Sequence, residues 1–165
     1  MSAEASRTKS SEDLKTAAPR IALGADHGGY PLKEAIKAML DKQGTAYRDF
    51  GTDSTIGVDY IPYAKLVGEA VAAGECSLGI LCCGTGLGMS IAANKICGIR
   101  AACCADWFSA KMTREHNDAN VLCLGARVTG EDAALTLVDV FLRTPFSGDE
   151  RHARRIAQIT ALEQA

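Results

Sequence analysis

The chain has 165 residues and a formal net charge of −2, with 47% hydrophobic and 23% charged residues. This length fits one domain with a sizeable core, and the composition is that of an ordinary globular protein. The small negative charge provides no basic field for nucleic acid or an anionic membrane surface. No apolar run approaches the roughly 20 residues that a membrane-spanning helix needs. We therefore expect a domain that binds neither nucleic acid nor membrane.

Residues 1–18 are polar, rich in Ser, Ala and Lys, and lack hydrophobic periodicity. We expect a disordered leader there, followed by a single domain over residues 19–165. Residues 20–25 form a short apolar run that predicts the first strand. A turn follows this strand and contains Asp26, His27 and two glycines.

Helices and strands then alternate along the chain, as helical apolar spacing gives way to short apolar runs. The pattern predicts helix 31–44, strand 46–50, loop 52–61, helix 62–73, strand 78–83, helix 87–94, strand 98–104, helix 106–115, strand 120–124, helix 131–142 and a last helix 149–162. The strands lack a polar face, which is typical of a parallel sheet covered on both sides. We therefore predict a Rossmann-like, three-layer α/β/α fold with a five-stranded parallel sheet and a C-terminal helix.

The helix that begins at Glu131 has a recognisable start signal in the residues before it. Thr129 and Asp132 form a Thr-x-x-Asp pattern, which predicts a capping box with the Thr129 hydroxyl as the cap.

The most informative stretch joins strand 78–83 to the helix after it. Cys83 ends the strand, and Gly84, Gly86 and Gly88 follow at alternate positions. Glycine lets the backbone adopt positive φ and approach a ligand closely, and backbone N–H groups at a helix start favour negative charge. A cysteine in such a place is favoured as the thiolate. The stretch therefore predicts a base beside an anion-binding turn, with neighbouring Cys82 facing the opposite side of the sheet.

Two simpler interpretations compete with this one. A cysteine that ends a buried strand is usually just a small hydrophobic residue, but packing alone does not require three closely spaced glycines. The glycines also resemble a dinucleotide fingerprint, with Asp106 placed where a ribose-binding carboxylate would stand. The spacing is G-x-G-x-G, however, and two strand–helix units precede it, whereas the fingerprint normally opens the first unit. We therefore expect no nicotinamide cofactor.

Seven cysteines are present, mostly in apolar runs. No C-x-x-C spacing occurs and no histidine cluster accompanies them, so a zinc site has little support. No signal peptide is recognisable. Reduced thiols in the cytoplasm are therefore the simplest expectation.

Three further groups have both a structural and a functional interpretation. Asp26 and His27 would serve a turn as well as a site, and His116 would suit the C-terminal end of a helix. Arg151 and Arg155 share one face of the last helix, which would fit a solvated basic face. The cations gathered at residues 151–155 favour an anionic ligand, and a phosphate group suits guanidinium side chains.

Five segments together resemble the type B ribose-5-phosphate isomerase family, from about Arg20 to the C-terminus. They are G-A-D-H-G-G at 24–29, V-D-Y at 58–60 with Y-A at 63–64, C-G-T-G-L-G-M-S-I-A-A-N-K at 83–95, G-I-R-A at 98–101 and R-E-H-N-D-A-N-V-L at 114–122. The resemblance implies an aldose–ketose isomerase of the non-oxidative pentose phosphate pathway. It would interconvert ribose 5-phosphate and ribulose 5-phosphate through an enediolate, with no metal and no cofactor.

The resemblance also implies roles for individual residues. Cys83 would be the general base, His116 would assist opening of the furanose ring with Asp59 as a helper, and Thr85 would hold the enediolate oxygens. The substrate-binding residues would be Asp26, His27, Tyr60, Gly84, Gly86, Leu87, Gly88, Asn117, Arg127, Arg151 and Arg155. Of these, His27 and the three arginines would bind the phosphate.

The same resemblance implies a homodimer whose site is shared across the interface, and pairing of dimers into tetramers stays open. Two other functions also remain open at this point. One is isomerisation of a six-carbon sugar phosphate, such as galactose 6-phosphate or allose 6-phosphate. The other is a phosphate-binding module without catalysis.

Overall fold

The structure is a computed structural model that describes residues 21–164, so the expected leader at 1–18 lies outside the described residues. Its strands form one five-stranded sheet in the order β2-β1-β3-β5-β4, and every neighbouring pair is parallel. The strands are β1 (Ile21–Ala25), β2 (Tyr47–Asp49), β3 (Leu78–Cys83), β4 (Ala101–Cys103) and β5 (Val121–Gly125).

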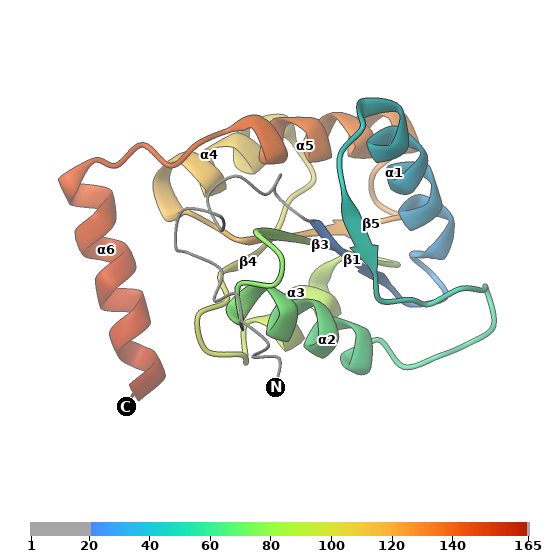
Figure 1. Ribbon diagram of the computed structural model, residues 1–165, viewed down its shortest axis with the longest axis horizontal. Helices are drawn as coiled ribbons and strands as arrows, with labels where there is room; N and C mark the ends of the chain where they lie inside the picture. The colour runs from blue at the N-terminus through green and yellow to red at the C-terminus, as the bar shows by residue number, and fades with distance from the viewer. Residues whose placement is uncertain (1–20, 165) are drawn as a thin grey trace, which may run out of the picture.

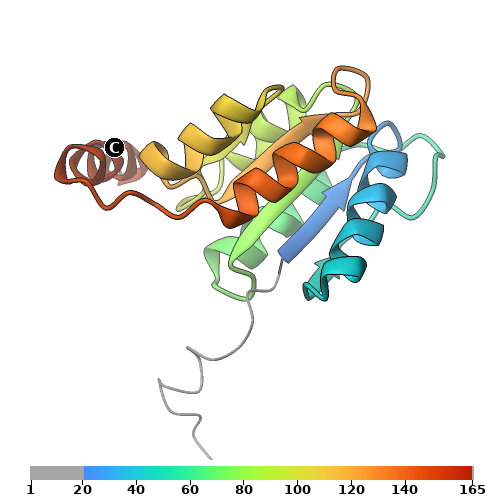
Figure 2. The ribbon, with the colours of Figure 1, turned by 90° about the horizontal axis from the view of Figure 1, so that it is seen from above.

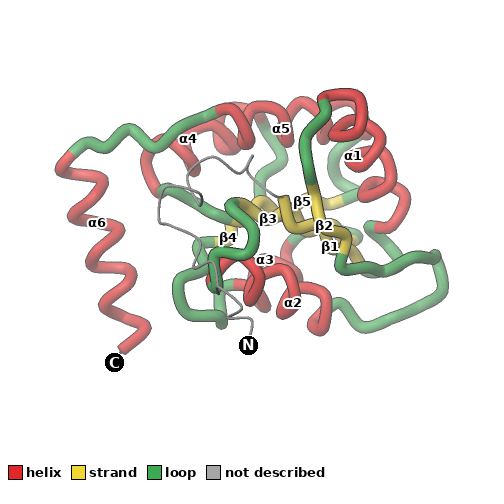
Figure 3. Tube along the Cα trace, viewed as in Figure 1, coloured by secondary structure: helices red, strands yellow, loops and turns green. Residues whose placement is uncertain are grey.

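Helices cover both faces of this sheet (Figure 1 and Figure 2). One face carries α1 (Tyr30–Gln43), α4 (Trp107–Asn117) and α5 (Glu131–Arg143), and the other carries α2 (Ile61–Ala72) and α3 (Leu87–Ala93). Two further elements, α6 (Glu150–Ala161) and a short 3-10 turn (Leu162–Gln164), stand to one side of the body beside α4 (Figure 3). The predicted three-layer fold with a C-terminal helix is confirmed.

Alternation along β3 divides the core into two halves. Cys82 packs with Ile80 on the face covered by α1, α4 and α5, whereas Cys83 and Leu81 pack on the face covered by α2 and α3. The predicted separation of the two thiols is therefore confirmed. Burial raises the pKa of the Cys82 thiol well above its ordinary value, so this thiol acts as a packed apolar group.

The turn from β3 into α3 accepts only glycine at its tightest point. Gly86 has φ +79°, and a Cβ added there would lie 2.8 Å from the Cys103 Sγ and 3.0 Å from the backbone carbon of Leu124. A Cβ on Gly125 would lie 2.6 Å from the backbone carbon of Thr85. The turn therefore rests directly on the backbone at the end of β5.

Helix α5 begins differently from the sequence prediction. Its N-cap is Gly130, which makes no side-chain cap hydrogen bond, and the Thr129 hydroxyl is buried with no partner among the described residues. The Thr129 N–H donates to the Gly125 carbonyl at 2.9 Å. The predicted capping box is therefore wrong, because this turn places Thr129 one residue before the cap position.

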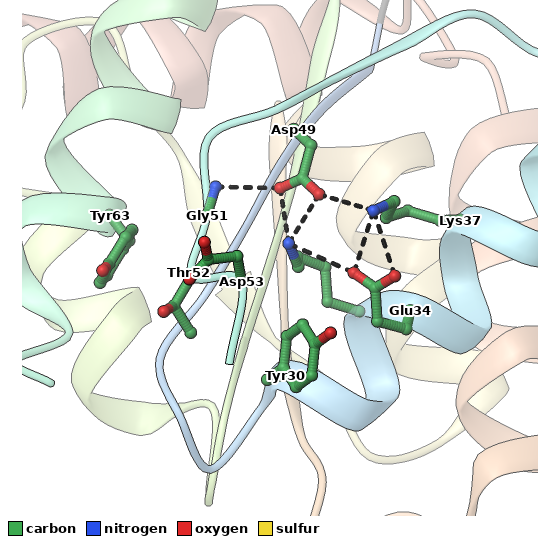
Figure 4. A pocket seen from close by; sticks show the side chains of 9 residues that line it. Tyr30, Glu34, Lys37, Asp49, Gly51, Thr52, Asp53 and Tyr63 are labelled. Atoms are coloured by element: carbon green, nitrogen blue, oxygen red, sulfur yellow. Dashed lines mark hydrogen bonds and ion pairs between the residues drawn. The ribbon is translucent and has the colours of Figure 1, made fainter. Parts of the chain in front are cut away.

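A charge network with Lys33 as its buried member joins α1 to the edge strand β2 (Figure 4). The Lys33 side chain is 2% exposed, and its Nζ lies 2.6 Å from one carboxylate oxygen of Asp49. Lys37 approaches both Asp49 and Glu34, and the Gly51 N–H donates to Asp49. Burial opposes ionisation of Asp49, but the bonds from Lys33 and Gly51 outweigh it and hold its pKa below the ordinary value.

The glycine turn yields a paired prediction on stability. Gly98 has φ +81°, close to that of Gly86, but a Cβ there would meet nothing within 4 Å. Gly98→Ala should cost about 1 kcal/mol for its left-handed backbone. Gly86→Ala should cost about 1 to 3 kcal/mol more, because its methyl group also meets fixed backbone. Urea unfolding measures both, and equal costs would contradict the close approach at Gly86.

Candidate active site

Cys83 occupies the last position of β3, at the edge where the carboxyl ends of the strands meet. Its side chain is buried, and the Gly86 N–H donates to its Sγ at 3.0 Å. A hydrogen bond from the backbone stabilises negative charge on sulfur. Because the turn is fixed by its contact with β5, this donor is held in place before any ligand arrives.

Thr85 and Leu87 complete the turn above the sulfur. The Leu87 N–H donates to the Thr85 hydroxyl at 3.4 Å, a long hydrogen bond. Both residues are exposed. The Thr85 hydroxyl is therefore open to a ligand that lies over the first turn of α3.

Arg127 lies beside the glycine turn and the turn after β1. Its guanidinium would be 3.5 Å from a Cβ on Gly84 and 3.6 Å from one on Gly28. The Cβ position of Gly28 is also 3.4 Å from an Asp26 carboxylate oxygen and 3.4 Å from the Gly84 N–H. The ends of β1, β3 and β5 therefore bring a thiol, a carboxylate and a guanidinium to one place.

The two charged groups at this place are held differently. Asp26 is buried, and its carboxylate accepts from the Gly29 N–H at 2.9 Å. Arg127 has no carboxylate partner among the described residues. Its guanidinium is thus available to an anion.

The loop between β2 and α2 folds back onto this group. The His27 Nδ1 lies 3.2 Å from both the backbone nitrogen and the backbone oxygen of Val58. The Tyr60 ring covers Gly88, where an added Cβ would lie 2.8 Å from the ring. Asp59, between these two contacts, is exposed. The loop residues that the sequence analysis predicted for the site therefore lie at the same end of the sheet as Cys83.

A second group of predicted residues lies elsewhere in the chain. Helix α4 crosses back from the end of β4 to the start of β5, so its last residues, His116 and Asn117, lie at the amino ends of the strands. Arg151 and Arg155 are on α6, which stands beside α4 and apart from α3 (Figure 1). Within one chain, the structure does not bring these four residues to Cys83.

Two groups outside the predicted set were also informative. Asp106 accepts hydrogen bonds from the Ser109 N–H and hydroxyl. Its carboxylate therefore caps α4 and is not a free ribose-binding group. His152 stacks on His116, with ring centroids 4.3 Å apart. The sequence contained His152 only as one member of a basic segment, and no spacing rule distinguishes it there.

A hollow of about 500 Å³ opens next to the charge network of Lys33 and Asp49 (Figure 4). Tyr30, Thr52 and Tyr63 also line it, but Cys83 and Arg127 do not. The predicted residues around Cys83 therefore form a separate site from this hollow.

Metal-binding clusters and membrane-spanning helices are both absent from the described residues. Within 21–164, no group of three or more His, Cys, Asp or Glu side chains is arranged to hold a metal ion. No helix in that range combines the length and apolar character that crossing a bilayer requires.

Comparison with known proteins shows which family this chain belongs to. The model of the ribose/galactose isomerase family matches residues 21–159. Ribose-5-phosphate isomerase B of Escherichia coli is 49% identical over 88% of this chain and 97% of its own length. A putative sugar phosphate isomerase of Bacillus subtilis is 47% identical over 88% of this chain and 97% of its own.

Solved structures agree with these relatives. Ribose-5-phosphate isomerase B of Clostridium thermocellum has a TM-score of 0.86 and 52% identity, covering 88% of this chain and 97% of that one. The Mycoplasma genitalium enzyme with bound ribulose 5-phosphate has a TM-score of 0.84 and 37% identity, covering 88% and 96%. This chain therefore belongs to the ribose/galactose isomerase family, with type B ribose-5-phosphate isomerases among its relatives.

Proposed function

We propose that this chain interconverts ribose 5-phosphate and ribulose 5-phosphate by proton transfer through an enediolate, without metal or cofactor. The observation that carries the proposal is the hydrogen bond from the Gly86 N–H to the Cys83 Sγ, inside a glycine turn beside Arg127. A thiolate with fixed donors around it suits removal of a proton from carbon. The family relationship supports the same reaction.

The chemistry follows from the positions around the turn. Cys83 takes the proton from C2 of the open-chain aldose, and the electron pair moves to make the C1–C2 double bond of the enediolate. Thr85 and the N–H groups of Gly84, Gly86 and Gly88 hold the developing oxygen charge. Cys83 then returns the proton to C1 while the hydroxyl proton of the C2 oxygen passes to the C1 oxygen and C2 becomes the carbonyl carbon, so that no atoms are gained or lost.

Binding at the far end of the sugar orients the reacting end. Arg127 and His27 would hold the phosphate together with Arg151 and Arg155, while Asp26 and Asn117 would bind sugar hydroxyls. His116 would assist opening of the furanose ring, with Asp59 as a helper, and Tyr60 would close over the turn. Such remote contacts lower the barrier by fixing the geometry of the reacting atoms.

A homodimer with a shared site explains why these residues form two groups in one chain. His116 lies at the opposite edge of the sheet from Cys83, so a second copy would bring its α4 end and α6 to the glycine turn. Large apolar side chains are open to a partner at Leu87, Ile91, Trp107 and Phe108, each between 58% and 64% exposed. Exposed apolar side chains of this size favour an interface.

Compartment and pathway follow from the reaction and from the thiols. Exposed thiols such as Cys97 and Cys103 persist in a reducing compartment, so we place the enzyme in the cytoplasm and in the non-oxidative pentose phosphate pathway. A second candidate is a six-carbon sugar phosphate as substrate, because the matching family model also covers galactose isomerases.

Proton NMR in D₂O tests the reaction directly. With chelator present, the protein should convert ribose 5-phosphate to ribulose 5-phosphate that carries solvent deuterium at C1, since the proton held by Cys83 exchanges with solvent before it is returned. Galactose 6-phosphate and allose 6-phosphate serve as parallel substrates. Conversion of a six-carbon sugar alone would replace the pentose assignment, and no conversion of any of them would leave a binding module.

Substitution of the proposed base should separate catalysis from binding. Cys83→Ala should lower kcat by about three orders of magnitude, because proton transfer loses its base, while phosphate affinity measured by calorimetry stays within about twofold. Cys97→Ala is the matched control, since this thiol is exposed and outside the site. Equal kcat values for the two variants would remove Cys83 from the mechanism.

Mixing two variants that are each impaired with ribose 5-phosphate tests the shared site. Equal amounts of Cys83→Ala and His116→Ala protein are unfolded together and refolded. The mixture should recover about one quarter of the parent activity, because half of the two-fold symmetric dimers pair one variant with the other and carry one intact site of two. Each variant refolded alone is the control. A mixture no more active than the two variants separately would place each site within one chain.

A further inference from the structure

The orientation of the His116 imidazole depends on a single neighbour. His116 is half-buried at the end of α4, and among residues 21–164 neither of its ring nitrogens makes a hydrogen bond. Its ring contact is with His152, at 4.3 Å between centroids and 34° between planes. The stack on His152 is therefore the one specific ring contact that the described residues give His116.

His152 itself is firmly held. It is 4% exposed, although both of its chain neighbours are exposed, and it is the one buried residue of α6. Its Nδ1 lies 2.8 Å from the Ser147 hydroxyl. The Ser147 N–H in turn donates to the carbonyl of Glu115, the residue before His116, at 3.0 Å. The two histidines are thus joined through both their rings and their backbones.

The surroundings of the His152 ring favour its neutral form. The Ser147 hydroxyl accepts from the Asp149 N–H at 3.2 Å and can also pair with Nδ1 of a neutral His152 ring. Burial lowers the pKa of His152, and the positive charges of His116, Arg151 and Arg155 act in the same direction, against Asp149. A neutral His152 can stack on His116 without repelling a proton there.

We propose that His152 is a positioning residue, whose stacked and anchored ring orients the His116 imidazole for opening of the furanose ring. This inference rests on the proposed function and deepens it. It assigns His152 no contact with the reacting atoms. Its effect should therefore be confined to the step that His116 assists.

The two substrates of the reaction separate that step from proton transfer. Ribose 5-phosphate is mainly a furanose and must open before its C2 proton can be removed. Ribulose 5-phosphate cannot form the corresponding ring, because the oxygen that would close it on C2 carries the phosphate. Exchange of its C1 proton with D₂O therefore needs Cys83 but no ring opening.

His152→Ala should lower kcat for ribose 5-phosphate at least roughly tenfold, while C1 exchange of ribulose 5-phosphate stays within about twofold of the parent. His152→Phe keeps a stacking ring and should recover part of that loss. Ser147→Ala removes only the anchor of Nδ1 and should give a smaller loss of the same kind. Arg154→Ala, an exposed neighbour on α6, is the control and should match the parent in both reactions.

A double-variant cycle gives the sharpest criterion. In a His116→Ala background, His152→Ala should cause no further loss of kcat, because there is no imidazole left to orient. A further tenfold loss, equal losses in both reactions, or unchanged kcat in both His152 variants would each overturn the inference. A parent protein inactive in both reactions would instead overturn the proposed function itself.

Discussion

The backbone contact between the glycine turn and the end of β5 is the constraint on which the geometry around Cys83 depends. A Cβ at Gly86 or Gly125 would enter space already occupied by backbone, so neither residue can be larger. This contact fixes Thr85 and directs the Gly86 N–H at the Cys83 Sγ. The polarity around the sulfur is therefore a property of the fold, present before substrate binds, as preorganised electrostatic stabilisation requires.

The parallel topology explains why some predicted residues meet at one edge of the sheet and others lie at the opposite edge. The ends of β1, β3 and β5 are neighbours in the sheet, so Asp26, Cys83 and Arg127 converge even though they are distant in sequence. The same crossover rule sends the end of α4 to the opposite edge, with His116. In the proposed homodimer, a second copy of the chain would bring this other group of residues to the glycine turn.

Much of this was predictable because the signals were local and repeated. Alternating apolar patterns gave the order of helices and strands, and the period of two along β3 placed Cys82 and Cys83 on opposite faces. The cap of α5 was mispredicted, because the turn that buries Thr129 depends on where Gly125 lies in the sheet. The His116–His152 stack joins two helices through a chain segment whose path no short-range pattern encodes.

Helix α6 packs on the rest of the chain through few side chains. Its side chains face solvent along most of its length, and His152 is the residue that it buries. Arg151 immediately precedes His152 in the chain, and Arg155 follows it by about one helical turn. Within the chain, α6 therefore buries one imidazole against α4, while its guanidinium groups stay hydrated. In the proposed dimer these arginines would reach a phosphate on the other chain from water, because burying them within their own chain would cost their hydration.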